Sequence, residues 1–319
     1  MERAAGEVRL YAVRCEGGAR LVRCCAPGGD VFVPDALGGL PVVEVGPYAF
    51  SARAPELPAG AFCTPAQGGC DAHDAAAIRS VTLPQSVRSI GDYAFYGCTG
   101  LVRLSVGGAL ESVGSDAFMN CWALRRLYVR GEGGLRACVQ QVLREYAGEL
   151  TVDLETPRAQ LLFPAFSEEY EELAAPHIFH YNIDGAGYAC RQCFEGRQLR
   201  FGLYDAAQRR LLAAHEFEAA ARAALGRLRW PAGLTPTARE AYRQTLAAHG
   251  EEALRWLLRE RDAQGLAFLL GLGLLPRAAL AAGCAAARKA GDTEALGLLL
   301  ESEHRHFGAP AGASADFSL

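Results

Sequence analysis

The chain has 319 residues, of which 50% are hydrophobic and 21% are charged, a composition typical of globular proteins and not of disordered chains. This length is enough for two domains with cores of their own. A formal net charge of −4 provides no electrostatic basis for binding nucleic acid or an anionic membrane surface, so we expect neither as a partner.

The cellular compartment is predicted from the first residues and from the cysteines. Residues 1–7 lack the basic start and apolar core of a secretory signal. No uncharged apolar run reaches the roughly 18–20 residues of a membrane helix. The 11 cysteines are an odd number, and most lie within apolar patterns. We therefore expect a cytoplasmic protein whose thiols are reduced.

The N-terminal segment Glu7–Cys25 contains two short alternating runs separated by Gly17 and Gly18, a pattern typical of a β-hairpin. We expect this hairpin to cover the open end of a stacked array. A degenerate first repeat follows in Val31–Phe50. The next segment, Ser51–Ala77, is either an eroded repeat or a surface insertion, and its weak periodicity favours an insertion.

The central segment Ile78–Val129 contains one pattern twice and the start of a third copy. Its apolar positions recur at a constant step along the chain, as Ile78, Val81 and Leu83, then Leu101, Leu104 and Val106, then Leu124, Leu127 and Val129. The same step relates Ala94-Phe95 to Ala117-Phe118 and Cys98 to Cys121. A fixed period with apolar residues in register predicts a solenoid of stacked coils. Each coil has a short strand, a core phenylalanine and a buried free thiol.

The sequence of one repeat is specific enough to identify a resemblance. Residues 89–101, Ser-Ile-Gly-Asp-Tyr-Ala-Phe-Tyr-Gly-Cys-Thr-Gly-Leu, resemble the motif of the BspA-type (Treponema pallidum-type) leucine-rich repeats. Val81–Pro84 and Val113–Cys121 fit the same family, and the resemblance covers roughly Val31–Val129. It implies a parallel β solenoid that binds proteins. Many members of the family are exported surface proteins with long arrays. Because the repeats are few here and residues 1–7 do not resemble an export signal, we expect that an adhesin role does not carry over.

The pattern changes after Val129. Leu135–Ala147 has the apolar spacing of an amphipathic helix and is followed by Gly148, as is common at a helix C-terminus. The next segment, Glu149–Leu154, is predicted to be the last strand of the sheet. Its Leu150 and Val152 follow Leu127 and Val129 at the same step as before, so the strand register is expected to continue. The first domain is therefore predicted to span residues 1–154.

Residues 155–307 are predicted to form an α-helical domain, and residues 308–319 a flexible tail. An apolar connector, Arg158–Ala165, precedes a helix that begins at Ser167 and runs to Ala174, and Pro176–Gly202 is irregular and aromatic. The following helices are expected at Tyr204–Leu212, His215–Arg229, Thr235–His249, Glu251–Arg261, Ala263–Leu272, Pro276–Ala290 and Asp292–Ser302. Short connections between them predict helical hairpins with ankyrin- or HEAT-like packing. The predicted fold class is thus α+β, a short leucine-rich-repeat β solenoid followed by an all-α helical-hairpin domain.

One cluster of residues has the composition of a metal site. His177 and His180 precede Cys190 and Cys193, and four such ligands suit tetrahedral zinc. The order of the two pairs is the reverse of a common zinc finger, and the competing interpretation places the cysteines in the core and the histidines near the surface. A thioredoxin-like role for the cysteines lacks the surrounding βαβ pattern.

Other motifs are weaker. The Gly-rich Asp184–Gly187 lacks the lysine and hydroxyl residue of a phosphate loop and is interpreted as a turn. His304 and His306 are interpreted as a solvated pair, and the glutamates of Glu168–Glu172 as an exposed helix face. No Gly-x-Ser-x-Gly elbow or Ser/His/Asp order occurs. We therefore predict no catalytic residues, no resident metal and no cofactor.

The best functional candidate is the outward face of the repeat strands. Its predicted side chains are Ser80, Thr82, Arg103, Ser105, Arg126, Tyr128, Glu149 and Thr151. They form a short ribbon with an Arg/Tyr centre, a composition found at protein-binding hot spots. The alternative is a face that is merely solvated or is covered by the helical domain. The leading hypothesis is a non-enzymatic scaffold or adaptor that binds a protein partner. The alternative function is a zinc- or thiol-dependent protein centred on His177, His180, Cys190 and Cys193.

Overall fold

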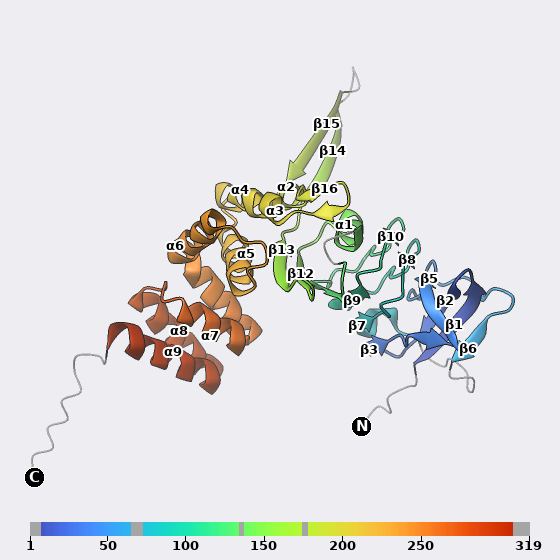
Figure 1. Cartoon of the computed structure of the whole chain (residues 1–319), viewed down its shortest axis with the longest axis horizontal. Helices are drawn as coiled ribbons and strands as arrows, with labels where there is room; N and C mark the ends of the chain where they lie inside the picture. The colour runs from blue at the N-terminus through green and yellow to red at the C-terminus, as the bar shows by residue number, and fades with distance from the viewer. Residues whose placement is uncertain (1–7, 65–72, 134–136, 174–177, 309–319) are drawn as a thin grey trace, which may run out of the picture. The chain divides into compact units, whose positions relative to one another are not determined.

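The structure of the chain is a computed structural model that describes residues 8–64, 73–133, 137–173 and 178–308. The chain divides into two compact units, Met1–Arg210 and Leu211–Leu319. Each is described by itself, and Figure 1 colours both from the N-terminus to the C-terminus. Among the described residues no helix combines the length and apolarity that a membrane span requires.

The first unit is built on a six-stranded sheet made by the predicted repeats (Figure 1). Its strands, in spatial order, are β13 (Ala159–Phe163), β12 (Leu150–Leu154), β11 (Arg126–Arg130), β9 (Arg103–Gly107), β7 (Ile78–Thr82) and β3 (Gly29–Phe32). Pairing is parallel from β3 through β12. Ser80 pairs with Arg103 and Arg103 with Arg126, so the constant step seen in the sequence is the strand register.

A second sheet forms another side of the coils. Its strands are β10 (Ser112–Val113), β8 (Ser89–Ile90), β5 (Leu40–Val45), β2 (Gly18–Cys25), β1 (Arg9–Cys15) and β6 (Phe62–Thr64), with β4 (Ala36–Leu37) paired to β5. The predicted hairpin is β1 and β2, and β2 pairs in parallel with β5. The hairpin therefore covers the edge of β5 at the end of the array, as expected from the need to cover an open solenoid end, and β6 lies beyond it.

The segment Ser51–Ala77 is an insertion and not an eroded coil. Asp30 of β3 pairs directly with Ser80 of β7, and Glu44 of β5 pairs directly with Ser89 of β8, so no coil lies between the two repeats. The insertion contributes β6, which pairs antiparallel with β1, and a short 3-10 helix at Ala75–Ala77.

The core of the coils repeats as predicted. The buried rings of Phe50, Phe95 and Phe118 stack one over the next, with centroids 4.7 and 5.5 Å apart. The thiol of Cys98 donates to the Phe50 carbonyl at 3.4 Å, and the thiol of Cys121 donates to the Phe95 carbonyl at 3.2 Å. Burial raises the pKa of Cys121 to about 12. These thiols are therefore structural core groups, as expected.

At the C-terminal end of the solenoid, the pairing of β11 with β12 differs in register from the prediction. The predicted helix is present as α1 (Ala137–Arg144), but Leu127 pairs with Val152 instead of the expected Leu150, and Val129 pairs with Leu154. The segment that contains α1 thus lengthens the coil by two positions. Because side chains alternate along a strand, a shift of two keeps the apolar residues of β12 facing inward.

The sheet also continues beyond the strand predicted to be its last. The expected connector contains β13, which pairs antiparallel with β12. Tyr204 provides hydrogen-bond partners for backbone groups of β13. Its hydroxyl accepts from the Leu162 N–H at 2.8 Å and donates to the Leu162 carbonyl at 3.0 Å. The boundary expected after Leu154 therefore lies inside the first compact unit, which extends to Arg210.

The helix predicted at Ser167–Ala174 is wrong. Residues Ser167–Leu173 form β14, which pairs antiparallel with β15 (Ile178–Asp184) inside the stretch expected to be irregular. The β-branched and aromatic residues of β15 supply a strong strand partner, and pairing outweighs the helix preference of the β14 glutamates. The rest of this region comprises α2 (Gly187–Cys190), β16 (Phe194–Glu195), β17 (Gln198–Leu199) and α3 (Phe201–Ala207).

A buried arginine holds this region together. The guanidinium of Arg191 donates to the Pro164 carbonyl, to Gly187 at 3.0 Å, to Tyr146 at 3.2 Å and to Gly148 at 2.8 Å. It also lies 4.9 Å from the ring centroid of Phe166. Arg191 thus joins the chain after α1, the end of β13 and the start of α2 through one side chain.

Helix α4 (Arg209–Ala213) crosses the boundary, and the second unit then contains α5 (Phe217–Arg229), α6 (Pro236–Glu260), α7 (Ala263–Gly271), α8 (Arg277–Ala290) and α9 (Thr293–Phe307). Two predicted helices are joined in α6, with a non-helical backbone at His249 between them. Thr235 caps α6 by accepting from the Ala238 N–H at 3.2 Å, as predicted. Leucines and alanines of these helices form one core.

The second half of the helical unit contains the same turn twice. Asp262 caps α7 by accepting from the Gly265 N–H at 2.8 Å, and Asp292 caps α9 in the same way from the Ala295 N–H at 3.0 Å. The residue before each aspartate has a left-handed backbone, with φ of 54° at Arg261 and 66° at Gly291. The two turns are therefore equivalent, which fits the helical-hairpin arrangement predicted for this unit.

Candidate protein-binding face

Two rows of side chains cross the outer face of the six-stranded sheet. The register aligns Asp30, Ser80, Arg103, Arg126 and Thr151 in one row and Phe32, Thr82, Ser105, Tyr128 and Asp153 in the other. Each of these residues is exposed or half-buried, whereas the residues between them on the strands are buried. We call these ten residues the strand face.

Seven of the eight predicted residues lie on the strand face, and one does not. Glu149 precedes β12, and the shift of register places Asp153 beside Tyr128 and moves Thr151 beside Arg126. Sequence reasoning missed Asp153 because it assumed that the constant step continued unbroken. It also missed Asp30 and Phe32, although the alternation of Val31, Phe32 and Val33 indicates that Phe32 faces outward.

At the β3 end, the strand face combines an acidic side chain and an aromatic one. The Ser80 hydroxyl donates to the Asp30 carboxylate at 2.5 Å, and the same carboxylate oxygen lies 3.8 Å from Nη2 of Arg103. Phe32, in the neighbouring row, is 64% exposed. This end of the strand face therefore presents an exposed aromatic ring beside charged side chains.

At the β12 end, Arg126 is held by its neighbours. Its Nε lies 3.7 Å from Asp153, its Nη1 donates to the Tyr128 hydroxyl at 3.2 Å, and its guanidinium carbon lies 5.9 Å from the Tyr128 ring centroid. Asp153 in turn accepts from the Gln160 amide at 2.8 Å. These contacts restrain the side chains of Arg126 and Tyr128.

The alternative metal cluster gains no support. Cys190 and Cys193 are buried, and burial raises the pKa of Cys193 to about 12. His177 lies outside the described residues, and His180 belongs to β15. In the described ranges, no three His, Cys, Asp or Glu side chains are grouped to hold a metal. A raised thiol pKa is also opposite to the low pKa of a redox-active cysteine.

Two further expectations can be compared with the structure. Gly185 has φ of 89°, which fits the interpretation of Asp184–Gly187 as a turn. The expectation that all thiols are reduced is wrong for Cys25, which is disulfide-bonded. Nine other cysteines of the described residues form no disulfide.

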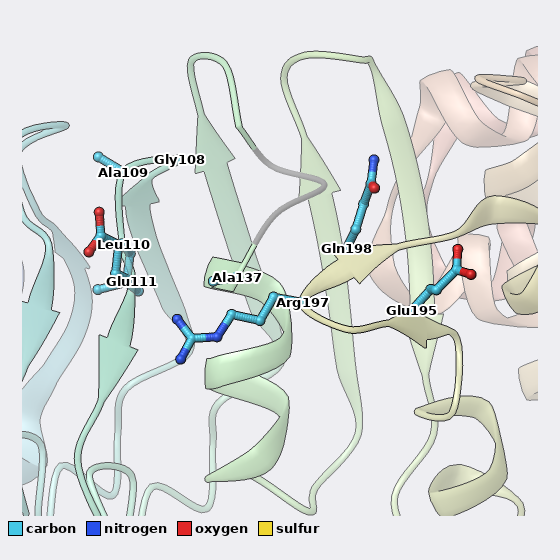
Figure 2. A pocket seen from close by; sticks show the side chains of 8 residues that line it. All are labelled: Gly108, Ala109, Leu110, Glu111, Ala137, Glu195, Arg197 and Gln198. Carbon is cyan, nitrogen blue, oxygen red and sulfur yellow. The ribbon is translucent and has the colours of Figure 1, made fainter.

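A hollow of about 470 Å³ lies elsewhere on the first unit, and Figure 2 shows its lining. Its walls come from the loop after β9, from Ala137 at the start of α1 and from the β16–β17 hairpin. Arg197 extends from that hairpin toward the loop that holds Glu111 (Figure 2). Its charged lining residues are exposed, and among the residues that line it there is no nucleophile paired with a base.

Comparison with known proteins supports the repeat assignment. Residues 70–135 match the model of the BspA type leucine rich repeat region. The T. pallidum leucine rich repeat protein shares 29% sequence identity, with a TM-score of 0.28 and coverage of 40% of this chain and 53% of that chain. A leucine rich cell surface protein from Faecalibacterium prausnitzii A2-165 shares 18% identity, with a TM-score of 0.27 and coverage of 46% and 31% respectively.

This chain therefore spans about half of the first of these proteins, 53% of its length, and about a third of the second, 31% of its length. No curated protein matches the chain. The match of residues 70–135 coincides with the coils that contain β7, β9 and β11. The predicted resemblance to the BspA-type leucine-rich repeats is confirmed over this range.

Proposed function

We propose that the chain is a non-enzymatic scaffold that docks a protein partner on the strand face. The observation that carries this proposal is the ordered strand face itself. Two rows of polar and aromatic side chains project from hydrogen-bonded strands, and ion pairs join Asp30 to Arg103 and Arg126 to Asp153. A rigid, pre-ordered surface binds at a small conformational cost.

The chemistry of the strand face favours a polypeptide as the partner. Arg126, Tyr128 and Phe32 are of the residue types that dominate protein-binding energy. Between them lie the small hydroxyl residues Thr82 and Ser105, which leave room for another main chain and offer it hydrogen bonds. Because Asp30 and Asp153 compensate the arginines, the strand face has no excess charge to attract nucleic acid.

The size of the strand face limits the partner. The five strands that carry the strand face, spaced about 4.8 Å apart and about five residues long, give an area of roughly 24 by 16 Å, or about 400 Å². A stable interface between folded proteins buries about 800 Å² on each partner. The strand face alone therefore suits a peptide segment, and a folded partner needs contacts beyond it.

A site-specific crosslink tests this proposal. A photo-crosslinking amino acid replaces Ser105 at the centre of the strand face, and a control variant carries it at Glu111, on another side of the coils. In cells that naturally contain the chain, we expect a discrete adduct from the Ser105 position and none from Glu111. Phe32→Ala combined with Tyr128→Ala should remove the adduct while leaving the melting temperature within a few degrees. Equal adducts from both positions, or an adduct that the double variant retains, would contradict docking on the strand face.

A further inference from the structure

A row of exposed residues borders the strand face at the start of its strands. The Val102 N–H donates to the Arg79 carbonyl at 2.8 Å, and the Arg125 N–H donates to the Val102 carbonyl at 3.0 Å. These three residues are therefore neighbours across adjacent coils, and all three are exposed. Trp122, close to Arg125 in the same coil, is 69% exposed. We call Arg79, Val102, Arg125 and Trp122 the arginine rung.

Among the described residues, no carboxylate pairs with the arginines of the arginine rung. On the adjoining strand face, Arg103 and Arg126 each lie near an aspartate. Arg79 and Arg125 have no carboxylate partner within the described residues, and their guanidinium groups contact backbone oxygens instead. A pair of positive groups without acidic neighbours, beside an exposed ring, is complementary to a ligand that is both acidic and apolar.

The two guanidinium groups are also held in place. Nη1 of Arg79 donates to the Gly100 carbonyl at 3.4 Å. Nη1 of Arg125 donates to the carbonyls of Trp122 and Leu124 at 2.9 and 2.8 Å and lies 3.3 Å from the Tyr146 hydroxyl. These contacts use only Nη1 of each guanidinium group, so the N–H groups of Nε and Nη2 remain as donors for a carboxylate. Ordered arginines that keep free donors lose less entropy on binding than mobile ones.

We infer that the arginine rung binds an acidic peptide segment that carries an apolar side chain. Two strand spacings separate Arg79 from Arg125, a span of about 10 Å. The partner's carboxylates engage the two guanidinium groups, and its apolar side chain lies on Val102 and Trp122. This inference rests on the proposed scaffold function and extends the strand face, whose area of about 400 Å² is small for a folded partner.

Fluorescence anisotropy with labelled synthetic peptides tests the inference on the full chain. The probes are an acidic peptide with leucines, an acidic peptide with serines in their place and a lysine peptide with leucines. We expect the first to bind most tightly and its affinity to fall as salt screens the charges. Arg79→Gln with Arg125→Gln should raise its Kd at least about tenfold, since each truncation of a central interface arginine costs more than about 1 kcal/mol.

The control removes the same charge elsewhere on the repeats. Arg14→Gln with Arg88→Gln changes two exposed arginines, one in β1 and one just before β8 of the other sheet, and it should leave the Kd within about twofold. Trp122→Ala should weaken the leucine peptide more than the serine peptide. All variants alter exposed side chains, and melting temperatures verify that they fold.

Several outcomes would overturn the inference. One is a failure of the wild-type chain to bind the acidic leucine peptide. Another is equal weakening by the control pair, which would indicate a diffuse charge effect. A third is binding to phosphatidylserine vesicles without binding to any peptide, which would assign the arginine rung to a membrane surface. If the peptide fails while the Ser105 crosslink persists, this inference falls and the docking role of the strand face stands.

Discussion

Arg191 provides the sharpest test of how the C-terminal end of the solenoid is held. The residue is 8% exposed, and four carbonyl groups from three segments accept its hydrogen bonds. Replacing it by methionine keeps a long apolar stem and removes every donor of the guanidinium. Three parts of the chain that approach each other at this side chain then lose their common partner.

The expected loss follows from two opposing contributions. Hydrogen bonds from a charged donor contribute roughly 1.5–3 kcal/mol each, or about 6 kcal/mol for four at the lower value. Burial lowers the pKa of Arg191 from its usual value to about 10, and at about 1.36 kcal/mol per pKa unit the desolvated charge costs about 3 kcal/mol. We therefore expect Arg191→Met to reduce the free energy of unfolding of the first unit by about 3 kcal/mol.

Native-state hydrogen exchange followed by mass spectrometry measures this loss in each unit separately. Peptides from residues 137–163 should lose protection in Arg191→Met, whereas peptides from residues 217–307 should not change. Arg144→Met is the matched control, since Arg144 is an exposed arginine on α1. If the two variants exchange alike, the four carbonyl contacts do not stabilise this part of the chain and the reasoning is wrong.

Three other changes test separate elements. Tyr204→Phe leaves the N–H and carbonyl of Leu162 without their hydroxyl partner, and urea unfolding should show a loss of about 2 kcal/mol, which an unchanged midpoint would contradict. The thiol of Cys121, whose pKa is raised to about 12, should resist alkylation of the native protein at pH 8 and react only in denaturant, as monitored by mass spectrometry. Rapid native labelling would show that the coil opens. Asp292→Ala removes the acceptor of the Ala295 N–H and should cost about 1 kcal/mol, measured as a lower melting temperature that Asp292→Asn largely restores.

Local pattern was a good guide wherever neighbouring coils impose the same environment on equivalent residues. The Phe95 and Phe118 rings stack, and their coils pair in register, because each residue packs against the equivalent residue of the neighbouring coil. It was a poor guide for β14, where the glutamates suggest a helix. Pairing with β15 outweighs this helix preference. The residues of β15 lie outside the short stretch of sequence from which the helix was predicted.

The candidate site shows the same division between local pattern and tertiary context. Alternation along β7, β9 and β11 identified Ser80, Thr82, Arg103, Ser105, Arg126 and Tyr128 as outward residues, because side-chain direction in a strand depends only on parity. Parity does not say how far one strand is shifted against the next. The shift at β12, which exchanges Glu149 for Asp153, depends on the length of the segment around α1.

The sequence by itself determined the solenoid, its core and the outward parity of its strands, since these follow from a pattern repeated at a constant step. Only the tertiary structure decided which charges meet. Asp30 reaches Arg103 from a strand that lies before the insertion, and Asp153 reaches Arg126 after a shifted register. Arg79 and Arg125 have no carboxylate partner among the described residues. Pairing of charges depends on distance in space, and strand register sets that distance.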